Sequence, residues 1–379
     1  MNSIINTFKI KELYPYRILR IIKKSVLIKR RFFRPSKELS VIPAQAKENW
    51  TDNCQLTERI IEFYKKANAQ EQLRGNSMWQ LFFNEKHKKI HETLLNAPLD
   101  QVYKVLKDSG ASELFYGFDN LTKSLQKETL NPLLLKTYVK LCFDSLIRFA
   151  EILGAIPLKN PESPIPFSGN VDNVIQKIEK CLGSKIKFPN SYPNERGASS
   201  SSGIISYRAP QALYQAWRIK QLLKGIENPS VLEIGAGLGR TAYYSKEFGI
   251  KNYSIVDLPF TGISSAYFLG QVFDESQVVL SGEPLLNQED SVKILTPDDF
   301  FQGKTQYDLI INIDSLTEMD PQVAGNYWRA IKTKAKMFLS INHEANSFTV
   351  RDLMKEEKVA IERSLYPMRN GYVEEIVQF

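Results

Sequence analysis

The sequence of 379 residues predicts an α/β fold with a mostly parallel sheet, preceded by an α-helical N-terminal region. An apolar run at residues 231–234 leads into three closely spaced glycines, which is typical of a buried parallel strand that turns into a helix. After this point, strand patterns and helix patterns alternate to the end of the chain. Before residue 160, helical periodicity prevails and strand patterns are few.

The N-terminal arm, residues 1–45, is basic. Eleven of the 50 Lys and Arg residues lie within residues 1–40, and the net charge of the whole chain is +8. The remainder is therefore close to neutral, which argues against a nucleic-acid-binding protein. Over residues 14–34, apolar and basic side chains fall on opposite sides of a helix. Such a helix is typical of a segment on an anionic membrane surface, and the alternative is a helix docked on the protein itself.

An α-helical region is predicted for residues 46–160. Apolar residues recur at helical spacing in four segments, at residues 56–69, 78–96, 99–107 and 132–153. Four prolines between residues 157 and 166 mark its end. Residues 161–204 follow as a linker or a lid, with one short helix at residues 171–182 and a Ser- and Gly-rich stretch. Polar loops of this length inside enzymes often close over a ligand.

The α/β domain is predicted for residues 205–379, and its first helix opens at Tyr207. Two short apolar runs, residues 277–280 and 292–295, each have the pattern of a strand, and either could be the third core strand. The other strands are expected at residues 231–234, 253–257, 307–313, 335–341, 360–366 and 372–379. The last two should form an antiparallel pair around the Asn370-Gly371 turn. Helices are expected from Thr241, over residues 260–273 and over residues 348–357.

The glycine turn predicts the kind of ligand. Glycines at 235, 237 and 239 follow Glu233, so the spacing is E-x-G-x-G-x-G and differs from the G-x-G-x-x-G of dinucleotide sites. A carboxylate beside a pyrophosphate would be repelled. It suits a ligand that has an ammonium group and no phosphate, such as S-adenosylmethionine. The alternative is a tight strand-to-helix turn with no ligand.

An acid at the end of the second strand supports this interpretation. Asp257 follows Gly239 by eighteen residues, a placement that lets a carboxylate accept both ribose hydroxyls of a bound nucleoside. Its alternative is an N-cap of the helix that Pro259 opens.

Candidates for acceptor chemistry follow the fourth and fifth strands. Methyl transfer to an oxygen needs in-line placement and a base for the hydroxyl proton. His343 is the only histidine of this domain, and neutral imidazole suits proton abstraction near pH 7. Asp314 and Glu318 could serve as the base, orient His343 or bind acceptor hydroxyls. All three are metal-ligand types, but no ligand spacing predicts a metal site.

Over residues 205–379 these features resemble the class I S-adenosylmethionine-dependent methyltransferases, which implies a Rossmann-like sheet closed by an antiparallel hairpin. Asp298 and Asp299 stand where family members often place an acid against the adenine amino group, and the alternative is a helix cap. The implied cofactor-binding residues are Glu233, Gly235, Ala236, Gly237, Gly239, Asp257, Leu258, Asp298, Asp299 and Asn312.

A narrower resemblance is carried by residues 314–319, DSLTEM, with Tyr327 and the upstream VDLP of residues 256–259. These resemble sugar O-methyltransferases encoded in bacterial surface-polysaccharide gene clusters. That family implies a cytoplasmic enzyme acting on a nucleotide sugar, a lipid-linked glycan or a polysaccharide chain, here peripheral on the inner face of the cytoplasmic membrane. The alternatives are methylation of another small molecule, or a non-catalytic glycan-binding module.

Overall fold

The computed structural model describes ten segments of the chain. They are residues 41–46, 53–70, 82–107, 109, 113–115, 132–158, 170–190, 192–284, 290–355 and 360–379. The basic helix predicted at residues 14–34 lies outside them. Within these segments, no helix combines the length and the apolar character needed to cross a bilayer.

Two compact units divide the chain. One consists of residues 1–47, 121–190 and 194–211, and the other of residues 48–120, 191–193 and 212–379. This division differs from the predicted domain boundaries, because residues 48–120 group with the α/β part.

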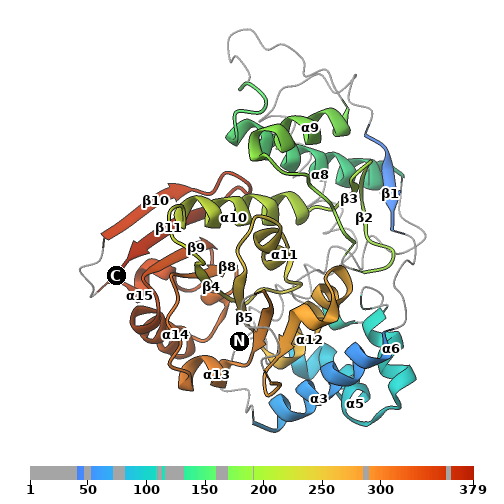
Figure 1. Cartoon of the computed structure of the whole chain (residues 1–379), viewed down its shortest axis with the longest axis vertical. Coiled ribbons are helices and arrows are strands. Elements are labelled where there is room, and N and C mark those ends of the chain that lie inside the picture. Colours follow the sequence, from blue (N-terminus) through green and yellow to red (C-terminus); the bar gives the residue numbers. More distant parts are fainter. Residues whose placement is uncertain are drawn as a thin grey trace. The chain divides into compact units, whose positions relative to one another are not determined.

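The first unit contains helices and a small antiparallel sheet (Figure 1). Its elements are α8 (Pro132–Ile152), α9 (Val171–Leu182), β1 (Pro43–Gln45), β2 (Arg196–Ser200) and β3 (Gly203–Ile205). The Ser- and Gly-rich stretch expected as a plain linker or lid is therefore a β-hairpin paired with β1. Gly203 closes the hairpin with a φ of +117°, and a Cβ there would lie 2.3 Å from the carbonyl oxygen of Phe188.

The second unit is organised around an eight-stranded sheet of order β10-β11-β9-β8-β4-β5-β7-β6 (Figure 1). The strands are β4 (Ser230–Ile234), β5 (Asn252–Val256), β6 (Val278–Leu280), β7 (Val292–Leu295), β8 (Leu309–Ile313), β9 (Met337–His343), β10 (Ala360–Leu365) and β11 (Tyr372–Gln378). All pairs are parallel except those that β11 makes with β9 and β10. The predicted α/β fold, mostly parallel and closed by an antiparallel hairpin, is confirmed. Both short apolar runs are strands, and β7 is the third core strand because it pairs with β5.

Helices cover both faces of this sheet. They are α10 (Ala209–Leu222), α11 (Arg240–Glu247), α12 (Pro259–Val272), α13 (Pro297–Gln302), α14 (Pro321–Lys334) and α15 (Val350–Leu353), with 3-10 turns η3 (Glu275–Gln277) and η4 (Leu316–Glu318). On one face, Leu232, Ile310 and Phe338 form a core with Trp328 and Ile331 of α14. The opposite face, which carries Glu233, lies against α10, α11 and α12.

Helix α12 is buried around its whole circumference, since every residue from Pro259 to Gly270 is buried. A helix that is apolar on all sides needs a second layer besides the sheet. That layer comes from three elements that contact α12, namely α3 (Cys54–Gln70), the π-helix η1 (Phe83–His87) and the 3-10 turn η2 (Glu113–Phe115). Two further helices, α5 (Lys88–Asn96) and α6 (Leu99–Lys107), pack against α3. Gly270 permits the close approach, because a Cβ there would lie 2.7 Å from Cδ2 of Leu56.

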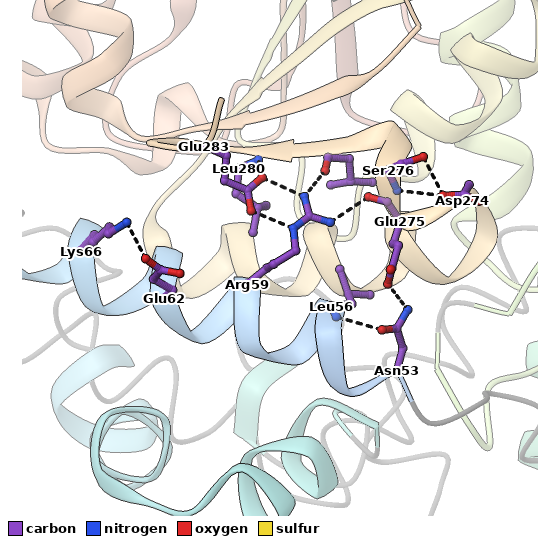
Figure 2. Close-up of polar contacts among 11 residues, drawn as sticks. Asn53, Leu56, Arg59, Glu62, Lys66, Asp274, Glu275, Ser276, Leu280 and Glu283 are labelled. Atoms are coloured by element: carbon purple, nitrogen blue, oxygen red, sulfur yellow. Dashed lines mark hydrogen bonds and ion pairs between the residues drawn. The ribbon is translucent and has the colours of Figure 1, made fainter. Parts of the chain in front are cut away.

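A polar anchor fixes α3 to the edge of the sheet (Figure 2). The Nε and Nη2 atoms of Arg59 each donate to the carboxylate of Glu283 at 2.8 Å. Its guanidinium also donates to the carbonyl oxygens of Glu275 at 2.9 Å and Val278 at 2.6 Å. These contacts, with the cover over α12, explain why the helical layer belongs to the same unit as the sheet.

Candidate active site

The glycine turn joins β4 to α11 at the carboxyl edge of the sheet. Gly235, Gly237 and Gly239 all have positive φ angles, of +77°, +62° and +77°. A Cβ at Gly235 would lie 2.3 Å from Oγ of Ser315, so no side chain fits there. Gly235, Ala236 and Gly237 keep part of their surface accessible. A ligand can therefore approach the bare backbone of this turn.

Asp257 lies directly beside the turn, as its position after β5 predicts. Its Oδ2 accepts the N–H of Gly237 at 3.1 Å, and its Oδ1 accepts the N–H of Leu258 at 2.8 Å. Burial raises the pKa of Asp257 to about 7, while hydrogen bonds from Gly237, Leu258 and Ala236 act in the opposite direction. The N-cap of α12 is Leu258, so the alternative role of Asp257 as that cap does not hold.

Glu233 lies beneath the turn and is 2% exposed. The hydroxyl of Tyr253 donates to its Oε2 at 2.9 Å. Burial raises the pKa of Glu233 to about 7, opposed by hydrogen bonds from Tyr253 and Thr241 and reinforced by the charge of Asp257. Because protein donors already hold this carboxylate, it offers a ligand its charge rather than an open surface.

Three other residues predicted to bind the cofactor have different surroundings. Asp299 closes a capping box, accepting the N–H of Thr296 at 2.7 Å and its hydroxyl at 2.6 Å, so the cap alternative holds for it. Asn312 is fully buried and donates to the carbonyl oxygen of Ile234 at 3.0 Å, which supports the turn from below. Asp298 lies in the first turn of α13 and is partly accessible. The contact between Asp298 and the adenine amino group stays a prediction.

The structure brings the three predicted catalytic residues together. Oxygen and nitrogen atoms of Asp314, Glu318 and His343 lie within 4.8 Å of one another, a grouping that could hold a metal ion and that the spacing along the chain did not predict. Asp314 has a φ of +60°, which is uncommon for a residue other than glycine. Backbone strain of this kind concentrates at functional sites.

Two residues that the sequence did not indicate hold Asp314 in place. Nη1 of Arg369 donates to its Oδ2 at 2.8 Å, and the hydroxyl of Tyr372 donates to its Oδ1 at 2.8 Å. The guanidinium also stacks over the Tyr372 ring, 3.9 Å from its centroid. The Asn370-Gly371 pair signals the hairpin, but no local pattern shows that the hairpin reaches the end of β8. Because the Arg369 guanidinium is already paired with Asp314, this carboxylate is a weaker ligand for a metal cation.

One backbone contact bears on the tautomer of His343. The backbone N–H of Ala345 donates to Nδ1 at 3.2 Å. In the neutral ring the proton then lies on Nε2, which is 3.8 Å from Oδ1 of Asp314. In that tautomer Nε2 carries the proton, which favours the alternative that the sequence left open, a carboxylate of Asp314 or Glu318 as the base. The assignment of His343 as the base stays a prediction.

Neither a family model nor a curated protein matches this chain. Among solved structures, the methyltransferase domain of bacterial CtHen1-CN has 12% sequence identity and a TM-score of 0.32, covering 44% of this chain and 100% of its own. A magnesium protoporphyrin IX methyltransferase (ChlM) from Synechocystis PCC 6803 with bound SAM has 12% identity and a TM-score of 0.32, over 45% and 80% of the two chains. The pyocyanin biosynthetic protein PhzM has 13% identity and a TM-score of 0.34, over 45% and 56%.

At identities and TM-scores this low, we assign the fold from the chain's own strand order and turn geometry. A parallel core, a glycine turn after β4, an acid after β5 and an antiparallel closing hairpin occur together in one unit. The second unit therefore has the Rossmann-like architecture of class I methyltransferases.

Proposed function

We propose that this protein is an S-adenosylmethionine-dependent O-methyltransferase. One observation carries the proposal, namely that the glycine turn lies beside the carboxylate cluster, which we define as Asp314 and Glu318 with the neighbouring His343. Ser315 lies between Asp314 and Glu318 in the chain, and its hydroxyl is 3.2 Å from the carbonyl oxygen of Ile234, the residue before Gly235. The candidate donor site and the candidate acceptor site are therefore neighbours at one edge of the sheet, as an in-line transfer requires.

The residues of the turn fit this cofactor. The three glycines leave the backbone of the turn bare, and we assign the ribose hydroxyls to Asp257, whose carboxylate lies against the N–H of Gly237. Glu233 contributes a negative charge near an ammonium group. When bound, S-adenosylmethionine supplies an electrophilic methyl group on a sulfonium.

The carboxylate cluster suits a sugar acceptor, because ionised carboxylates accept hydrogen bonds from vicinal hydroxyls. Arg369 and Tyr372 each occupy one acceptor position on the partly accessible carboxylate of Asp314, and its remaining lone pairs can accept from sugar hydroxyls, so we assign it to acceptor binding. Glu318 takes the hydroxyl proton on its carboxylate, and His343 donates through Nε2. The narrower resemblance at residues 314–319 supports a sugar on a nucleotide, a lipid-linked glycan or a polysaccharide chain.

Two alternatives keep the same fold. Methylation of another small molecule would use the same turn with a different acceptor, whereas a non-catalytic glycan-binding module would need neither the bare turn nor Asp257. The basic helix predicted at residues 14–34 supports a cytoplasmic location on the inner membrane face, where lipid-linked sugars would be at hand.

The test incubates the full chain with labelled S-adenosylmethionine and a panel of nucleotide sugars and lipid-linked oligosaccharides. We expect a methylated sugar product, and Glu318→Gln should lower turnover by roughly 10²- to 10⁴-fold with cofactor affinity nearly unchanged. A smaller loss in Glu318→Gln than in His343→Gln would return the base role to His343. Calorimetry that detects no binding of S-adenosylmethionine by the wild type would exclude the proposal as a whole.

A further inference from the structure

A cavity of about 200 Å³ lies over the β6–β7 edge of the sheet, on the face that α13 covers. Val279 of β6 pairs with Lys293 of β7, so both side chains point to this face, and Leu295 follows on the same face. Phe300 of α13 and Tyr307, which precedes β8, form part of the wall. Among the described residues that line the cavity, none belongs to the glycine turn or the carboxylate cluster. The cavity is therefore separate from the candidate active site.

Lys293 is a half-buried cation on the floor of this cavity. It makes no hydrogen bond or ion pair with any residue that the structure describes. Its neighbours on the face are apolar, with Val279 across from it on β6 and Leu295 next to it on β7. Removing a charge from water is unfavourable unless an opposite charge replaces the lost hydration. An anion bound in the cavity would supply that charge.

A second ammonium group belongs to Lys334, at the end of α14. This side chain lines the cavity and is only 9% exposed. Its Nζ donates to the carbonyl oxygen of Gly303 and lies 5.7 Å from the centroid of the Phe300 ring. An ammonium group has three protons, so Lys334 can also donate to a ligand.

The two carboxylates of the lining already have protein partners. Glu283 is paired with Arg59 (Figure 2), and Asp299 accepts the N–H and the hydroxyl of Thr296. With Arg59 included, three described cations therefore stand against two described anions around the cavity, which leaves a net charge of +1. A single negative charge on a ligand would neutralise it.

We propose that this cavity is a second ligand site, which takes a small monocarboxylate with an apolar body. The carboxylate pairs with Lys293, and the apolar part lies against Leu295 and Phe300. Pockets for drug-sized ligands measure roughly 300–1,000 Å³, so the ligand is smaller than those. Inorganic phosphate fits less well, because it would leave the apolar wall uncovered. The inference does not depend on the proposed function, since no methyl donor takes part in it.

A titration followed by ligand-observed NMR tests the site, using the full chain without S-adenosylmethionine. The probe is benzoate, which joins one carboxylate to an apolar ring, and benzamide has nearly the same shape without the charge. We expect saturable binding of benzoate and at least about tenfold weaker binding of benzamide and of inorganic phosphate. Benzoate should also slow hydrogen exchange in residues 297–307, which include the wall of the cavity.

Variants of Lys293 test the charge. Lys293→Met should weaken benzoate binding at least about tenfold, whereas Lys293→Arg keeps the charge and should stay within about threefold of the wild type. Lys304→Met is the matched control. Lys304 is exposed and lies between two lining residues, Gly303 and Thr305, but does not line the cavity itself. This variant should bind benzoate as the wild type does.

A variant with both lysines intact guards against a folding defect in Lys293→Met. Ser281 lines the cavity from the turn after β6 and is partly accessible, so Ser281→Leu reduces the space from the surface. We expect it to weaken benzoate binding as well. Unchanged binding in either Lys293→Met or Ser281→Leu overturns the inference, and so does the absence of saturable binding by the wild type. Binding of benzamide or inorganic phosphate as tight as that of benzoate also overturns it, because the site would then not select a monocarboxylate with an apolar body.

Discussion

Removal of the Arg59 anchor should destabilise the second unit measurably. Its guanidinium makes four hydrogen bonds, two of them to the carboxylate of Glu283, and the side chains of the pair are only 22% and 26% exposed (Figure 2). Hydrogen bonds to charged groups contribute about 1.5–3 kcal/mol each, but they are not additive and partial exposure weakens them. For Arg59→Met we therefore expect a loss of about 2–4 kcal/mol in the free energy of unfolding.

Denaturant unfolding followed by circular dichroism measures this loss. Lys66→Met is the matched control on the same helix, because Lys66 pairs with Glu62 on the surface, where the side chains are 58% and 67% exposed. It should cost at most about 0.5 kcal/mol. Replacing Glu283 with Leu in the Arg59→Met background should recover part of the loss, because it removes an unpaired carboxylate. Equal stability of Arg59→Met and Lys66→Met would refute the reasoning.

The same anchor gives a pH dependence. Burial alone would raise the pKa of Glu283, but hydrogen bonds from Arg59 and the backbone of Leu280 hold it below its ordinary value. A carboxyl with a depressed pKa in the folded state stabilises the fold above its unfolded pKa, and the contribution disappears as the pH falls through the folded value. The difference in stability between wild type and Arg59→Met should therefore shrink in acid.

Three further outcomes are expected. Gly235→Ala should lower the melting temperature more than Gly249→Ala, because both positions have positive φ but only a Cβ at 235 meets another residue; equal shifts would contradict this. Burial raises the pKa of Glu233 from 4.5 to about 7. A carboxyl with a raised pKa in the folded state favours folding at low pH, and the free energy of unfolding should fall by up to about 3 kcal/mol as the pH rises through about 7. Unfolding of the ligand-free protein between these pH values should show a flatter profile in Glu233→Gln, and identical profiles would exclude the effect. The full chain should co-sediment with anionic liposomes at low salt more than a chain starting near residue 45, and equal binding by both would remove the membrane role of residues 14–34.

Local patterns in the sequence predicted most of the elements. The helix at residues 171–182 has the predicted bounds because Asn170 caps its start and Gly183 ends it with a left-handed φ. The turn after β4 and the acid after β5 were also found, since parallel strands bring their carboxyl ends to one edge. Such signals depend on a few neighbouring residues and need no knowledge of the rest of the fold.

The remaining features depend on contacts between distant parts of the chain. Arg369 lies 55 positions from Asp314, and no periodicity shows that the two residues meet. The tautomer of His343 depends on the backbone N–H of Ala345, and only the folded loop fixes the direction of that N–H. The sequence of helix α12 does indicate its surroundings. Apolar residues occupy every side of the helix, so it needs packing partners on the side away from the sheet as well as on the side that faces it.

The packing of α12 between the sheet and α3 has a consequence for the design of truncated fragments. A fragment beginning at residue 205 would have the whole sheet, the glycine turn and the carboxylate cluster, and so every residue of the proposed site. It would also lack Leu56 and Phe63, and the outer side of α12 would meet water as one continuous apolar surface. Soluble monomers rarely tolerate exposed patches of that kind, and they associate through them instead. We expect such a fragment to aggregate and a fragment beginning at residue 48 to stay dispersed, so the smallest soluble piece that contains the proposed site includes helices that contribute no residue to that site.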